Sequence, residues 1–283
     1  MLRGEDFDYQ SNNLLRRFPM DITVSFDAIA AMGVAMAVCL AFPFGFIVYN
    51  RKKMMLMPII AGIIGYLLLG FFISGVCIDS LARLIAAPFL GSLLSAAGYS
   101  AVVVFGSRVI QKYLQGKYSG GGVALSYGLG FSFINLVIMH GAELFSSISL
   151  ATAINNNGFE LVSTTVDDPD SLFELVSEIA NKSTLVHYLG AAELACYFIL
   201  TVAVSVLIWY SIANNDRVCF GLALVGEFVV MMLLNYCAQG GVDILVTEIV
   251  YAVISLGLAV YAYFIYNRYG DGEKYMADPV RRF

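Results

Sequence analysis

Residues 28–49 read AIAAMGVAMAVCLAFPFGFIVY, and the basic run Arg51, Lys52 and Lys53 follows one residue later. The stretch holds no charged side chain. About 20 such residues form a helix long enough to cross a hydrocarbon core of about 30 Å. A basic run directly after an apolar segment is typical of a helix end at the membrane surface. The stretch therefore predicts a membrane-spanning helix that is retained as an anchor.

The same pattern recurs along the chain. Hydrophobic residues make up 59% of the sequence and charged residues only 13%, whereas soluble domains have about 45–50% and about 25%. The mean hydropathy is +0.79. We therefore predict an all-α, polytopic transmembrane helix bundle of about seven spans within residues 22–268. After the first span at 28–49, the others are expected at about 54–76, 84–107, 122–150, 184–212, 218–238 and 249–267.

Three segments are expected outside the membrane: a polar N-terminal segment at 1–21, a loop at 154–183 and a tail at 269–283. Within the loop, Asp167 and Asp168 precede Pro169, which is a helix-start signal. Apolar residues then recur at helical spacing: Leu172, Phe173, Leu175, Val176 and Ile179. This pattern predicts a short amphipathic helix. It would serve either as a lid over helix ends or as a docking surface for a partner.

Basic residues predict the orientation in a cell membrane. If seven spans alternate in direction, one side of the membrane receives most of the basic residues: Arg51, Lys52, Lys53, Arg108, Lys112, Lys117, Arg217, Arg268, Lys274, Arg281 and Arg282. The opposite side receives Arg3, Arg16, Arg17, Arg83 and Lys182. The C-terminal tail is therefore expected in the cytoplasm, and the N-terminus and the 154–183 loop outside.

The charge distribution also limits the partners. The formal net charge is −5, and no basic stripe interleaved with aromatic residues is present, so the sequence argues against nucleic acid as a partner. A polytopic chain is expected to contact membrane lipid. Another membrane protein or a peptide is a further candidate partner.

Ionisable residues inside the predicted spans are candidate functional residues, because a charge in the membrane is costly. His140 and Glu143 lie one helical turn apart in the fourth span, and the fifth carries His187 and Glu193. Glu227 lies in the sixth span, and Glu248 near the start of the seventh. Such side chains hold a metal or relay protons when they converge. Alternatively, those near helix ends face water, and the deeper Glu193 is a hydrogen-bonded structural acid.

Small residues suggest where helices pack closely. Ala87, Gly91 and Ser95 recur every four residues in the third span, a spacing that lets two helix backbones approach each other. Gly128, Gly130 and Ser132 in the fourth span are expected to form the facing surface.

Four stretches of the chain resemble the YhfC-type family of intramembrane proteases, which is related to the CAAX-processing and bacteriocin-immunity group. They are GFIVYNRKK at 45–53, LLSAAGYSAVVVFGSR at 93–108, GGVALSYGLGFSFINLVIMHGAE at 121–143 and AAELACYFILTVAVSVLIWY at 191–210. The resemblance covers most of the chain from about residue 30. It implies a helical membrane bundle with peptidase chemistry.

The family's polar motif positions are altered in this chain. Where the family has two glutamates and an arginine, the resemblance places Ser95, Ala96 and Tyr99. Where it has a histidine followed by an acid, this chain has Phe131 and Asn135. In the fifth span Glu193 and Ser205 keep the family pattern, while Leu194 and Thr201 replace an arginine and a histidine. No charged residue occurs from 84 to 107, so the paired glutamates are absent from that helix.

These replacements remove the groups that activate water, because hydrolysis needs a general base or a metal that acidifies water. The leading hypothesis is therefore a catalytically inactive member without a cofactor that binds a partner helix, peptide or lipid. Glu193, Glu227, Ser205 and Asn135 are its candidate binding residues.

Two alternatives remain open. One is an active peptidase with a relocated site built from His140, Glu143, His187 and Glu193, and only this reading calls for a divalent metal. The other is a transporter or a membrane subunit of one, which the acids Glu193 and Glu227 suggest. No phosphate-binding loop is present.

Overall fold

The computed structural model describes residues 22–164, 166 and 168–270. The predicted N-terminal segment 1–21, Asp167 and most of the predicted tail lie outside the described residues. All regular secondary structure in the described residues is helical. Seven of the helices there are long and apolar enough to span a membrane. These helices are Phe26–Asn50, Leu56–Arg83, Pro88–Gln115, Gly122–Asn157, Thr184–Asn214, Arg217–Ala238 and Ile244–Tyr269. The predicted all-α polytopic bundle is confirmed.

Two of the spans contain wider π-helical turns. The second consists of α3 (Leu56–Gly65), η1 (Tyr66–Ile78) and α4 (Asp79–Arg83). The fourth consists of α6 (Gly122–Phe133), η2 (Ile134–His140) and α7 (Gly141–Asn157). Stretches of π-helix are rare and often occur at functional sites. Here η1 begins at Tyr66 and η2 begins one residue before Asn135, two residues that return in the site below.

The chain divides into two compact units, and each is described here by itself. Among the described residues, the first unit comprises those within 22–38 and 140–191, and the second those within 39–139 and 192–270. Helices α2 (Phe26–Asn50) and α10 (Thr184–Asn214) contribute residues to both units.

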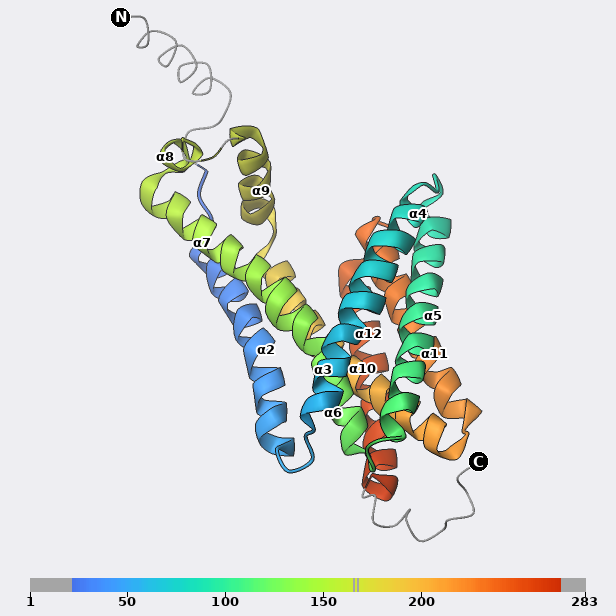
Figure 1. The fold of residues 1–283 in the computed structure, drawn as a ribbon. Coiled ribbons are helices and arrows are strands. Elements are labelled where there is room, and N and C mark those ends of the chain that lie inside the picture. The colour runs from blue at the N-terminus through green and yellow to red at the C-terminus, as the bar shows by residue number, and fades with distance from the viewer. Residues whose placement is uncertain (1–21, 165, 167, 271–283) are drawn as a thin grey trace, which may run out of the picture. The chain divides into compact units, whose positions relative to one another are not determined.

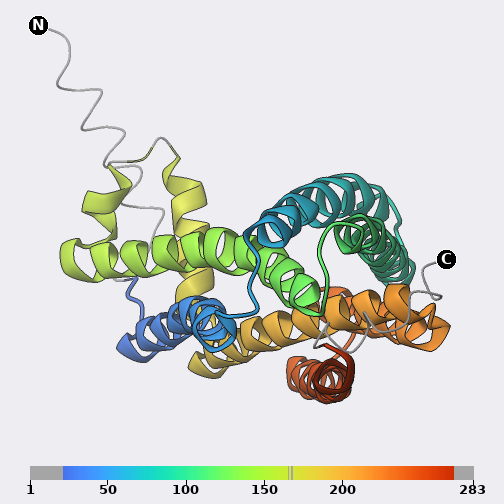
Figure 2. The same ribbon diagram turned by 60° about the horizontal axis from the view of Figure 1, so that its bottom comes forward.

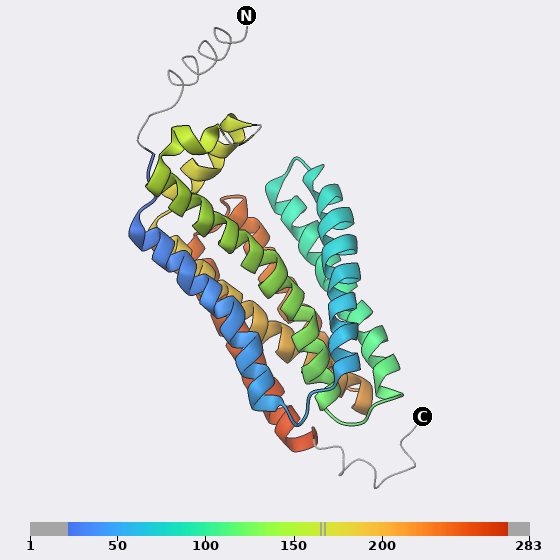
Figure 3. The same cartoon turned by 60° about the vertical axis from the view of Figure 1, so that its left-hand side comes forward.

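The first unit is built around α7, with α8 (Phe159–Ser163) and α9 (Pro169–Asn181) beyond its C-terminal end (Figure 3). Asp168 caps α9 by accepting hydrogen bonds from the backbone N–H groups of Asp170 and Ser171, at 3.1 and 3.2 Å. The buried face of α9 packs with α2, α7 and α8 in one apolar cluster: Val24, Ala28, Met32, Ala151, Ile154, Phe159, Leu172, Val176 and Ile179. The predicted amphipathic helix therefore forms, while Leu175 of the predicted stripe is exposed.

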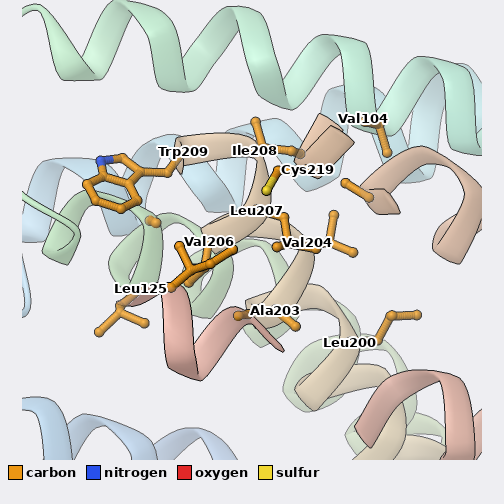
Figure 4. Packing of buried hydrophobic residues seen from close by; sticks show 14 of the residues in the cluster. Val104, Leu125, Leu200, Ala203, Val204, Val206, Leu207, Ile208, Trp209 and Cys219 are labelled. Carbon is orange, nitrogen blue, oxygen red and sulfur yellow. The ribbon is translucent and has the colours of Figure 1, made fainter. Parts of the chain in front are cut away.

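The second unit has α10 at its centre. Leu207, Ile208 and Trp209 of α10 are buried in the main apolar core (Figure 4). The same core takes residues from α5 (Pro88–Gln115), α6, α11 (Arg217–Ala238) and α12 (Ile244–Tyr269). The span formed by α3, η1 and α4 runs beside α5 (Figure 1), and α5 also packs against α11 (Figure 2).

The close helix contacts differ from the predicted ones. Gly130 of α6 lies against the backbone of Ile59 in α3, and Gly128 lies against Val202 and Ser205 of α10. In α5, Gly91 instead meets the carbonyl of Ala82 in α4. The prediction that the small residues of the third and fourth spans face each other was therefore wrong. Each set packs against a different neighbouring helix.

Candidate functional site

Polar residues from six elements meet inside the second unit. We call Tyr66, Tyr99, Asn135, Tyr197, Glu227 and Tyr251 the tyrosine–glutamate cluster; they come from η1, α5, η2, α10, α11 and α12. The Tyr66 hydroxyl donates a hydrogen bond to Asn135 Oδ1 at 2.7 Å. Tyr99 interacts electrostatically with Tyr66, Tyr197, Glu227 and Tyr251, which joins the members into one group.

Glu227 is the acid of this cluster. Its side chain is only 6% exposed in an apolar helix. A carboxyl group at such a position is costly and marks a candidate functional residue. Tyr99, Tyr197 and Tyr251 all lie within electrostatic range of it. Three phenol side chains therefore lie near this buried carboxyl group.

The Tyr197 hydroxyl is buried beside two polar side chains, Asn135 and Thr201. A buried hydroxyl needs polar partners to offset its desolvation. The interior of the cluster is therefore polar at this point as well.

Two further acids adjoin the cluster. Glu193 of α10 and Glu248 of α12 interact with each other electrostatically, and Cys196 interacts with both. Tyr251 interacts with Glu193 as well as with Glu227, and so connects this pair to the cluster. Glu248 is 7% exposed and Glu193 is half-buried.

The structure brings together several residues that the family resemblance placed at motif positions. Tyr99 and Asn135 belong to the cluster, and Thr201 lies beside Tyr197. Phe131 packs edge-on against the Tyr66 ring, with centroids 5.3 Å apart and planes at 90°. Phenols, an amide, a hydroxyl and a phenyl ring therefore meet here beside the Glu227 carboxyl group.

Ser95 and Ser205 lie apart from this cluster. Ser95 donates to Asp79 Oδ1 and accepts a hydrogen bond from Asn235 Nδ2 at 2.9 Å. Ser205 accepts from Gln111 Nε2 at 3.0 Å and donates to the Ala124 carbonyl at 2.7 Å. Ser205 is thereby placed in a helix-packing contact among α5, α6 and α10.

The remaining predicted residues belong to the first unit. His140 and Glu143 approach each other at 3.8 Å, with side chains 42% and 75% exposed. His187 has a buried Nε2 with no hydrogen-bond partner among the described residues. Glu193 belongs to the second unit. His140 and Glu143 thus form a partly exposed pair.

The tyrosine–glutamate cluster contains few side chains of the kinds that bind a catalytic metal. Such sites commonly use three protein ligands drawn from histidine, cysteine and carboxylates. Among the residues that the structure describes, no group of three such side chains is gathered closely enough to hold an ion. In the cluster itself Glu227 is the single carboxylate, and phenols and an amide surround it.

The sequence did not point to Tyr66, Tyr197, Tyr251 or Asp79. The three tyrosines lie in apolar runs, where a tyrosine is usually an aromatic core residue. The available signal was the hydroxyl group of each, which needs a polar partner when it is buried. Asp79 contacts Ser95 from the preceding helix, a pairing that the spacing of residues within one helix does not reveal.

The fold and the site define a multi-pass helical membrane protein with polar side chains converging inside one unit of the bundle. The family model for the YhfC intramembrane metalloprotease matches residues 38–254, so this chain belongs to that family. No curated protein and no solved structure matches the chain. The matched range begins next to the start of the second unit at residue 39.

Proposed function

We propose that this chain is a non-hydrolytic member of the YhfC family that acts by binding a membrane lipid. The observation that carries the proposal is the set of side chains at the convergence of the motif helices. Tyr99, Asn135 and Thr201 stand where the family resemblance places an arginine, an acid and a histidine. Peptide hydrolysis needs a base or a metal to activate water. Amide and hydroxyl groups at these positions supply neither.

Glu227, Glu193 and Glu248 are acids near these positions. A single carboxyl group could act as a general base only beside a bound water and a group that stabilises the transition state. Tyrosine rings and hydroxyls occupy the surroundings of Glu227 instead. The cluster therefore supports a structural or binding role for this acid rather than a hydrolytic one.

A groove in the second unit supports the binding role. It has a volume of about 670 Å³ and lies among α2, α10 and α12. Its apolar lining includes Phe42, Phe46, Phe198, Val202, Val206 and Ala259. This size falls in the range of about 300–1,000 Å³ that is typical of small-molecule sites. The lining suits an acyl chain.

The end of the groove suits an anionic headgroup. Asn50, Lys53 and Asn267 lie there, and Lys53 Nζ is 4.8 Å from the centroid of the Tyr266 ring. Arg51 and Lys52 precede Lys53 in the same basic run. In the predicted orientation this end faces the cytoplasmic leaflet, which carries the anionic lipids. The combination favours an anionic phospholipid over an apolar partner helix.

Filling the groove should displace the lipid. Gly45 of α2 lines the groove, and a side chain added there would meet no atom within 4 Å. We expect Gly45→Trp to lower the amount of co-purified anionic phospholipid about tenfold, the loss that corresponds to excluding about two methylene groups. Native mass spectrometry of the full chain in detergent measures the bound lipid.

Gly33→Trp is the matched control. Gly33 lies in the same helix and also faces open space, but it does not line the groove. It should retain lipid at the wild-type level. Equal lipid binding by both variants would contradict the proposed groove.

A further inference from the structure

A second cavity lies at the other end of the second unit's helices. It has a volume of about 400 Å³ and lies among α4, the first turns of α5 and the last turns of α11. Polar side chains line it, namely Asp79, Arg83, Ser95, Asn235 and Gln239. This lining distinguishes it from the apolar groove.

Hydrogen bonds within the cavity wall orient Asp79. Asn235 Nδ2 donates to Ser95 Oγ at 2.9 Å, and the Ser95 hydroxyl donates to Asp79 Oδ1. Gln239 Nε2 donates to Ser92 Oγ at 2.9 Å, which holds the end of α11 against α5. The second carboxylate oxygen, Asp79 Oδ2, has no hydrogen-bond partner among the described residues. One oxygen of a fixed carboxylate is therefore available to a ligand.

Arg83 provides the opposite charge. It lies four residues after Asp79, a spacing at which opposite charges on a helix often pair. Nevertheless no ion pair joins the two side chains, and Arg83 forms no ion pair or hydrogen bond with any other residue in the described ranges. Both side chains line the same cavity. The cavity therefore separates a carboxylate from a guanidinium group.

The N-terminus of α5 adds partial positive charge to the side of the cavity where Arg83 lies. The helix begins at Pro88, which also lines the cavity, and its N-cap residue Ala87 provides no side-chain hydrogen bond. The first amide groups of a helix carry a partial positive charge and lack intrahelical partners. An anionic group near Arg83 would face this helix end as well.

We propose that this cavity binds a small zwitterion, with its ammonium group on Asp79 and its carboxylate or phosphate group on Arg83. The ligand class is an α-amino acid or the ethanolamine phosphate headgroup of a lipid, since both carry the two charges a few bonds apart. A charged carboxylate and a charged guanidinium form stronger hydrogen bonds than neutral groups do, which gives selectivity for zwitterions over uncharged solutes. This site does not depend on the proposed function, because Asp79 and Arg83 belong neither to the tyrosine–glutamate cluster nor to the apolar groove.

Binding of two soluble probes to the full chain in phosphatidylcholine nanodiscs tests the proposal. The probes are L-alanine and phosphoethanolamine. Each is measured by isothermal titration calorimetry up to 10 millimolar, about ten times the Kd of about 1 millimolar that is typical of a weak site. Binding of L-alanine alone identifies an amino-acid site. Binding of phosphoethanolamine alone, reproduced by nanodiscs that contain phosphatidylethanolamine, identifies a headgroup site. If neither probe binds to the wild-type chain, the proposal is wrong.

Three variants locate the binding. Asp79→Asn and Arg83→Gln should each weaken the affinity at least about tenfold, the loss expected for a charged hydrogen bond. Arg217→Gln removes the same charge at an exposed residue outside the cavity and should bind like the wild type. Because Asp79 contacts Ser95, thermal unfolding is used to check that Asp79→Asn still folds. Arg83 is exposed, so Arg83→Gln is expected to fold and tests the proposal even if Asp79→Asn does not. Unchanged affinity in folded Arg83→Gln would overturn the proposal.

Discussion

Asn135 shows how a neutral polar side chain fits the interior of the bundle. An acid at this position would bring a negative charge between η1 and α10. The amide instead accepts a hydrogen bond from Tyr66 at 2.7 Å, and Phe131 one turn earlier packs on the same Tyr66 ring. A neutral amide with a partner costs far less in a membrane interior than a carboxylate does. The Asn135 amide is thus part of a packed, hydrogen-bonded interior.

The helix cap at Asp168 makes α9 sensitive to acid. The hydroxyl and the backbone N–H of Ser171 donate to this carboxylate, at 2.6 and 3.2 Å, and hold the pKa of Asp168 below its ordinary value. Because the pKa of Asp168 is lower in the folded than in the unfolded state, its carboxylate stabilises the folded helix. This stabilisation is complete at pH values above the unfolded pKa of about 3.9. That contribution is lost as the pH falls through the lowered folded pKa. We expect hydrogen-exchange protection of Leu172 and Val176, corrected for intrinsic rates, to fall below about pH 4.

Asp168→Asn is the control for this prediction. Asparagine is also a good N-cap residue but does not titrate. The variant should keep its protection across the same pH range. If it loses protection as the wild type does, the acid sensitivity arises elsewhere.

At the scale of helices, close backbone contacts rather than charged groups hold the second unit together. A side chain on Gly62 would meet the carbonyl of Tyr127, and one on Gly130 would meet the carbonyl of Ile59. Helix association in membranes depends on such contacts between small residues. The two helices α3 and α6 therefore have a fixed spacing at this point, next to Tyr66 and Phe131.

Gly130→Ala should accordingly destabilise the protein. The added methyl group would collide with the Ile59 carbonyl, and backbone atoms cannot move aside cheaply. We expect a loss of about 1–3 kcal/mol, as for other overpacked cores. Thermal unfolding in one detergent measures it.

Gly221→Ala in α11 serves as the comparison, because a side chain there meets nothing within 4 Å. It should leave stability unchanged or raise it by about 1 kcal/mol through helix propensity. Equal stability changes in the two variants would contradict the close contact between α3 and α6.

The seven membrane-spanning helices could be predicted from the sequence, because backbone polar groups in a bilayer must pair within a helix and long apolar runs therefore indicate helices. Glu227 and Glu248 were recognisable for the same reason, since a charge within an apolar run stands out. The partners of these acids were not, because Tyr99 and Tyr251 look like ordinary apolar core residues until their hydroxyls are placed. Helix pairing was also hidden, since one small-residue stripe fits several neighbours. Gly130 was expected to face α5 and instead meets α3.

The central claim is that the protein does not hydrolyse peptides at the site where the helices carrying Tyr99, Asn135 and Thr201 meet. This claim can be tested directly. The measurement is cleavage of fluorogenic membrane-embedded peptides by the purified full chain in nanodiscs, with and without added zinc. The Glu193→Gln and Glu227→Gln variants serve as controls, because any hydrolysis at this site would depend on the remaining acids. We predict that the wild-type chain and both variants show the same background signal. Cleavage by the wild type that disappears in either variant would contradict the account.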